Sequence, residues 1–125
     1  MDLLVRRVSW ALLLASSLCL GCHRQSGPPA PLAAENIPAE FEKGFAKAKP
    51  QVKELSSKVL SALQTKDYAA AYAAVQELCA APEAGARQKE LAARALLTIT
   101  GLLQTAQSQG DQKAAEALQI HKMYK

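Results

Sequence analysis

Residues 87–109, RQKELAARALLTITGLLQTAQSQ, carry the apolar pattern that decides the fold. Five apolar residues recur every three or four positions and share one helix face: Leu91, Ala95, Ile99, Leu102 and Ala106. Leu96 and Leu103 lie beside this row and widen it. The spacing predicts a long helix, and the wide apolar arc predicts that it is the most buried helix of the fold. We expect Gly101 to mark a point where another helix approaches closely.

The preceding segment predicts a helix from Asp67, a good N-cap, to the residue before Pro82. Its apolar face consists of Tyr68, Ala71, Tyr72, Val75, Leu78 and Cys79. No histidine or lysine lies one turn from Cys79, so we expect this cysteine to be a small buried hydrophobe and not a reactive thiol.

An earlier apolar stripe predicts a helix from Pro38 to about Thr65, with Asn36 as its cap. The stripe consists of Phe41, Phe45, Ala48, Val52, Leu55, Val59 and Leu63. Because it passes through Pro50 without losing phase, we expect one helix kinked at residues 46–50. A complete break at Pro50 is the alternative.

At the other end of the chain, Gly110 is expected to end the long helix in a left-handed conformation, and Asp111 to cap a further one. That last helix carries Ala114, Ala117, Leu118, His121 and Tyr124. His121 lies near its C-terminus, where a helix dipole favours positive charge. The whole pattern predicts an all-α fold, a four-helix antiparallel hairpin array over residues 37–125.

The N-terminal stretch RRVSWALLLASSLCLGC, residues 6–22, is typical of a secretory signal. Two arginines precede an apolar run that is short of the roughly 20 residues needed to cross a bilayer, which disfavours a retained anchor. The Arg6–Arg7 pair leaves the twin-arginine route as an alternative to general secretion. Residues 1–21 are thus expected to be removed.

The following residues 22–36 are rich in Pro and Ala and are expected to form a tether. We expect its segment Pro28–Leu32 to be disordered, because proline removes backbone donors and favours an extended chain.

The junction Leu18-Cys19-Leu20-Gly21-Cys22 resembles a bacterial lipobox, although Cys19 stands where that motif prefers leucine. The resemblance implies cleavage after Gly21 and a lipid on Cys22. The protein would then face the periplasm from a membrane of the cell envelope, the outer membrane in a Gram-negative cell. Ordinary secretion with an unmodified Cys22 is the alternative. The opening IPAEFEKGFAKAKPQVKEL (37–55) also looks like that of small envelope lipoproteins, which implies no activity.

The spacing of Tyr68, Ala71, Val75, Leu78 and Pro82 resembles the second helix of a tetratricopeptide hairpin. Leu78 is larger than that motif's usual alanine, Pro82 is one residue early, and the preceding helix lacks the motif's Leu-Gly pair. Asp67 and Asp111 begin similar helices 44 residues apart, whereas the motif repeats every ~34 residues. The resemblance implies helical-hairpin geometry.

Composition disfavours several functional classes. Loss of residues 1–21 removes two arginines and one aspartate and lowers the net charge from +4 to +3, too little to indicate a nucleic-acid partner. If Cys19 is removed and Cys22 acylated, Cys79 is left without a disulfide partner. The spacing of residues suggests no metal site, cofactor site or nucleophile–base pair, so we expect a protein that is not an enzyme.

Alanine is frequent in the predicted helices and buries little area, so part of the long helix is expected to stay exposed. The predicted interaction face consists of Leu96, Ile99, Leu102 and Leu103. We therefore expect a lipid-anchored module that binds an envelope protein. The alternative is a structural lipoprotein that binds copies of itself, and an enzyme or ligand carrier is the least favoured class.

Overall fold

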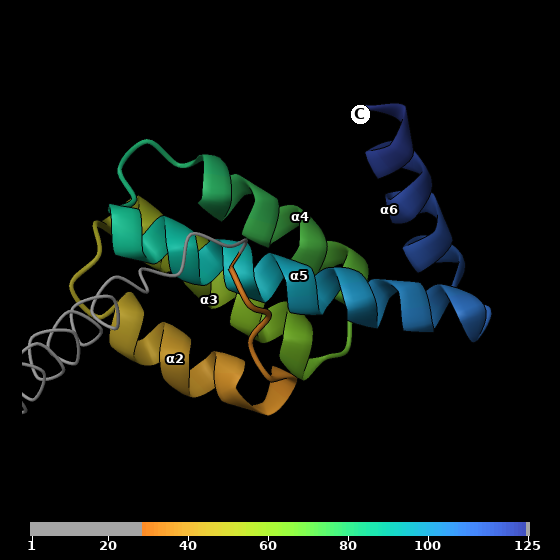
Figure 1. The fold of residues 1–125 in the computed structure, drawn as a ribbon, viewed down its shortest axis with the longest axis horizontal. Coiled ribbons are helices and arrows are strands. Elements are labelled where there is room, and N and C mark those ends of the chain that lie inside the picture. Colours follow the sequence, from red (N-terminus) through yellow and green to blue (C-terminus); the bar gives the residue numbers. More distant parts are fainter. Residues whose placement is uncertain (1–28, 125) are drawn as a thin grey trace, which may run out of the picture.

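The computed structural model describes residues 29–124, and within that range it contains helices and no strands (Figure 1). The elements are η1 (Ala34–Asn36), α2 (Ile37–Gly44), α3 (Pro50–Gln64), α4 (Tyr68–Ala80), α5 (Ala86–Ser108) and α6 (Gln112–Met123). The predicted all-α class is therefore confirmed. The number of α-helices in the described part is five, one more than the sequence predicted.

The extra helix arises at Pro50, where one kinked helix had been predicted and the chain instead breaks. α2 ends at Gly44, and Pro50 occupies the first turn of α3. Lys49 before it is extended, with φ −63° and ψ 154°, because the proline ring disfavours helical backbone in the preceding residue. The in-phase apolar stripe did not exclude this break, since α2 and α3 run antiparallel and bury their apolar faces in the same core (Figure 1).

Helices α2 to α5 surround this core in sequential antiparallel order (Figure 1). α4 contacts α3 on one side and α5 on the other, while α2 contacts α3 and α5 but not α4. α2 therefore covers the seam between α3 and α5 on the side away from α4. α6 contacts α5 and α4 and leaves the bundle at a steep angle.

Part of the expected tether is bound to α5, which corrects the prediction of disorder for the part of Pro28–Leu32 that the structure describes. Leu32 is buried, and its N–H donates to the carbonyl of Arg94 at 3.4 Å. Arg94 Nε donates to the Ala30 carbonyl at 2.9 Å, and the Thr98 hydroxyl donates to that of Leu32. An extended chain leaves its backbone groups free for such bonds, and here these bonds hold it against α5.

The start of α2 also differs from the prediction. Asn36 was expected to cap the helix, but it lies in η1 with helical φ and ψ and makes no capping bond. The 3₁₀ turn η1 leads directly into α2 in place of the expected cap. Pro38 does lie in the first turn of α2, as predicted.

The turns before α4 and α6 are as predicted. The Asp67 carboxylate accepts from the N–H of Ala70, and that of Asp111 accepts from the N–H of Ala114, each at 3.2 Å. Gly110 has a φ of +93° and ends α5 in the left-handed region. These local signals fix where each helix begins.

The prediction that the long helix is the most buried one was wrong. α4 buries five of its 13 residues, whereas α5 buries five of its 23. α4 is flanked by α3, α5 and α6, while α5 extends beyond its neighbours (Figure 1).

The role expected for Gly101 belongs instead to Gly44. A Cβ at Gly101 would have no atom within 4 Å, so no helix approaches it. A Cβ at Gly44 would collide with the Leu91 side chain of α5. Gly44 therefore allows the close contact between α2 and α5.

Candidate functional site

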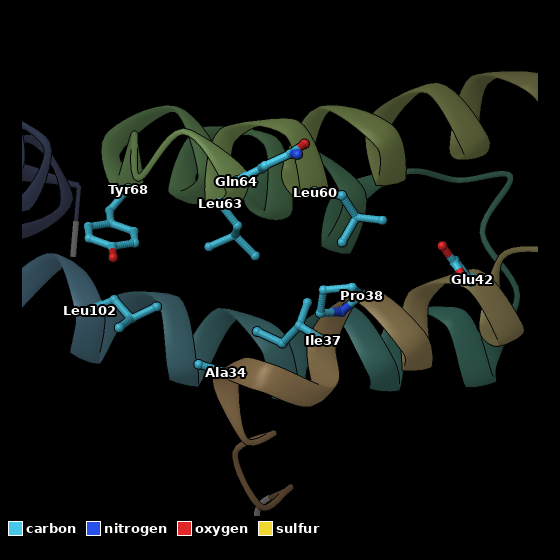
Figure 2. A pocket seen from close by; sticks show the side chains of 9 residues that line it. All are labelled: Ala34, Ile37, Pro38, Glu42, Leu60, Leu63, Gln64, Tyr68 and Leu102. Carbon is cyan, nitrogen blue, oxygen red and sulfur yellow. The ribbon is translucent and has the colours of Figure 1, made fainter.

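An apolar groove opens where η1 and α2 meet the C-terminal half of α3. Its volume is about 590 Å³. Its walls are Ala34, Ile37, Pro38, Leu60, Leu63, Tyr68 and Leu102, with Glu42 and Gln64 also lining it. Figure 2 shows Leu60 and Leu63 of α3 opposite Ile37 of α2 and Leu102 of α5, with the Tyr68 ring at one end. This set of residues is called the apolar groove below.

The phase of each helix explains why these side chains line a groove and do not fill it. Val59 is fully buried, and its neighbour Leu60, about 100° further around α3, is half-buried. Leu103 is likewise fully buried and its neighbour Leu102 is half-buried. α2 is only eight residues long. It covers the seam between α3 and α5 but leaves the side near Tyr68 open (Figure 2).

The predicted interaction face is divided by the fold. Ile99 and Leu103 are fully buried core residues, which corrects the expectation that they form a surface. Leu96 and Leu102 are half-buried, and Leu102 lines the apolar groove. The face was predicted as one continuous arc, but the neighbouring helices cover its middle.

The sequence prediction missed most of the groove because its residues come from five separate elements. One signal was present for Ile37: it precedes Phe41 by four positions and therefore continues that apolar stripe. Leu60 had no such signal, because it lies outside the row through Val59 and Leu63. Only the pairing of α2 with α3 places Leu60 opposite Ile37.

A second hollow, of about 460 Å³, lies between α4 and α6 and holds a chain of polar groups. Gln76 Nε2 donates to the Tyr72 hydroxyl at 3.0 Å, and that hydroxyl bonds to His121 Nδ1. The Tyr72 and His121 rings meet edge to face with centroids 5.6 Å apart. Burial raises the pKa of Tyr72, so the phenol keeps its proton at neutral pH while it shares a hydrogen bond with His121 Nδ1.

This polar chain joins α6 to α4. It adds a hydrogen bond to the helix-end position predicted for His121. A protonated phenol with a raised pKa is a weak nucleophile. The arrangement therefore fixes the position of α6 and supplies no activated group.

The end of α6 exposes large apolar side chains. In the described part of the chain four large hydrophobic residues are exposed, namely Leu97 at 46%, Ile120 at 55%, Met123 at 70% and Tyr124 at 85%. Three of the four lie at the end of α6. Ile120 and Tyr124 also border the second hollow.

The other candidate functional groups lie outside the described residues or are not activated. Cys22 and the predicted signal lie outside the described residues. Burial raises the pKa of the Cys79 thiol, which lowers the fraction present as thiolate. Residues 29–124 contain no group of three or more His, Cys, Asp or Glu that could hold a metal ion.

The same described range has no helix long and apolar enough to span a membrane. Comparison of the chain with known protein families, with curated proteins and with solved structures gives no match. The apolar groove is thus the candidate site, because η1 and four α-helices contribute to it and large aliphatic side chains line it.

Proposed function

We propose that this protein is a lipid-anchored component of the bacterial cell envelope that acts by binding another protein and not by catalysis. The anchor would be a lipid on Cys22, left at the N-terminus after removal of residues 1–21. The support for it is Gly21-Cys22 after a short apolar run. Attachment would be firm if both the thiol and the new amino group were acylated, since one chain binds only marginally.

The apolar groove carries the binding part of the proposal. Its aliphatic walls and open side suit the apolar face of a helix, which typically inserts side chains spaced three or four residues apart. Glu42 and Gln64 supply polar groups that would orient the bound segment. A partner with apolar side chains next to a basic residue fits this combination.

The tetratricopeptide-like geometry remains a finer proposal. The antiparallel order of α3 to α4 supports it, as does the matching apolar spacing within α4. The contact of α2 with both α3 and α5 is a feature that the hairpin pattern alone does not predict.

Self-association is the alternative function, and one observation favours it. The exposed apolar end of α6, with Met123 and Tyr124 more than two-thirds exposed, offers a ligand of the kind that the groove would accept. In this alternative the protein would be a structural component built from copies of itself.

Two measurements test the proposal. Cys22→Ser should move the protein from the membrane fraction to the soluble periplasmic fraction, and unchanged fractionation would contradict the anchor. A photo-reactive residue at Gln64, at the groove, should give a defined protein adduct in intact cells. The matched position is Gln107, which is exposed on α5 and does not line the groove. Adducts of equal yield from both positions would contradict the groove as the binding site.

A further inference from the structure

Two apolar surfaces of this molecule have no partner within the described chain. One is the apolar groove, and the other is the end of α6. Met123 and Tyr124 follow Ile120 by three and four residues, so both lie on the same face as Ile120. That face points away from Ala114 and Leu118, which α6 buries against the bundle. The molecule thus presents both an apolar helix end and an apolar groove.

We propose that the exposed end of α6 of one copy inserts into the apolar groove of a second copy, so that copies join head to tail. The inference rests on the proposed function of the groove as a helix-binding site, and it identifies the bound helix as part of the same chain.

The side chains match in kind. Met123 is flexible and its sulfur makes favourable contacts with aromatic rings, while Tyr68 places a ring at one end of the groove. Ile120 would contact aliphatic walls such as Leu60 and Leu102. The three exposed side chains of α6 are thus of the size and polarity that a hollow of about 590 Å³ accepts.

The charges are complementary as well. η1 and α2 carry three acidic side chains, Glu35, Glu40 and Glu42, and one basic side chain, Lys43. α6 carries two lysines, Lys113 and Lys122, and one glutamate, Glu116. Lys113 precedes Ile120 by seven positions and shares its face. Opposite net charges favour the pairing of α6 with the groove. A pairing of two α6 helices is less favourable, because lysines would face lysines.

The placement of the two surfaces requires a second molecule. α6 contacts α4 and α5 and neither α2 nor α3, whereas the groove opens between α2 and α3. In Figure 1, α2 lies along the lower side of the bundle and α6 rises on the upper side from the end of α5. One copy cannot fill its own groove. A contact between two different surfaces leaves one groove and one α6 free at the ends, so it continues into a ring or a chain. Anchoring on one membrane would raise the local concentration of copies.

Co-purification tests this geometry. Two full-length copies with different tags are produced in the same cells, and the membranes are solubilised in detergent. Met123→Glu places a charge on the exposed end of α6, and Leu60→Glu places a charge in the apolar groove. Each variant paired with itself should lose co-purification by about ten-fold or more, since a buried carboxylate without a partner is costly. Met123→Glu paired with Leu60→Glu should recover it, because one intact α6 still meets one intact groove.

The controls keep the result independent of folding. Leu97→Glu changes the other exposed large hydrophobic residue and should leave co-purification unchanged. Glu42→Lys alters an exposed charge at the groove without touching the core and should lower co-purification several-fold.

Three results would overturn the proposal. If Leu60→Glu copies still associate with each other, the interface is α6 against α6. If the mixed pair fails although each variant is folded by circular dichroism, the two surfaces do not meet. If no variant changes co-purification while the adduct at Gln64 remains, the groove binds a different protein, and the proposed function stands without this inference.

Discussion

The hairpins α3–α4 and α5–α6 have the same type of turn but differ in how their second helix packs. In the first turn the Asp67 N–H donates to the Ala62 carbonyl at 2.8 Å, and in the second the Asp111 N–H donates to that of Ala106 at 3.0 Å. Together with the bonds from Lys66 and Gly110 to the carbonyls three residues before them, these form the Schellman pattern. The two turns are equivalent positions 44 residues apart.

The helices that follow these turns bury different faces. The buried Tyr72, Val75 and Leu78 of α4 correspond, 44 positions later, to Glu116, Gln119 and Lys122 of α6. Of the large apolar residues of α6, Leu118 is buried, whereas Ile120 and Met123 come at other positions and face solvent. Turn chemistry thus decides that a hairpin forms. The position of the apolar residues decides whether its second helix completes the core or presents a free face.

The largest contrast is expected between buried and exposed side chains of the two helices. Leu78→Ala should lower the free energy of unfolding by about 2–5 kcal/mol, because it leaves a cavity in the core. Met123→Ala should change it by no more than about 0.5 kcal/mol, because Met123 is 70% exposed. Urea denaturation of both variants measures the contrast. Equal losses would mean that α6 is as well packed as α4.

A smaller effect is expected from exchanging the turn residues. Lys66 has a φ of +56° and Gly110 a φ of +93°, so both lie in the left-handed region, where glycine is least strained. Lys66→Gly should stabilise the protein by about 1 kcal/mol, and Gly110→Lys should destabilise it by about the same amount. Thermal unfolding of the two variants measures both changes in stability. Changes of the same sign would contradict the equivalence of the two turns.

An effect of about the same size is expected from the hydrogen bond that joins α4 to α6. Tyr72→Phe should cost about 1 kcal/mol at neutral pH. The buried phenol has a raised pKa in the folded protein, so its contribution is fully present below the unfolded pKa and is lost as the pH rises through the raised value. Above about pH 10, the wild type should therefore lose stability more steeply than Tyr72→Phe.

Tyr124→Phe is the matched control for this comparison, because Tyr124 is an exposed tyrosine at the C-cap of α6. Its stability should follow the wild-type curve from pH 7 to the alkaline end. Identical curves for the wild type and Tyr72→Phe would show that the phenol does not hold α6 in place.

Local signals in the sequence predicted the turns before α4 and α6 and the starts of these two helices correctly, whereas the expected cap at Asn36 does not form. Asp67, Asp111 and Gly110 act through bonds within a few residues of themselves, so their effect is visible without knowledge of the neighbours. Pro50 was another exception. The apolar stripe through it is satisfied either by one long helix or by two antiparallel helices around a shared core, and only the fold distinguishes them.

Burial within α5 and the groove could not be predicted from spacing alone. Ile99 and Leu102 belong to the same apolar row, but one is in the core and the other lines an open groove, because α2 covers only part of the seam. Gly101 was interpreted as a contact point, although it faces open space. Each of these outcomes depends on which helix lies opposite, which is a non-local property.

Amide hydrogen exchange of the full-length protein, measured at increasing concentration, tests most directly the claim that α6 is left free for contact between copies. We expect protection of residues 112–124 to rise with concentration, together with that of residues 60–64 at the groove, while α4 keeps its high protection throughout. Exchange in residues 112–124 that does not depend on concentration would contradict the account.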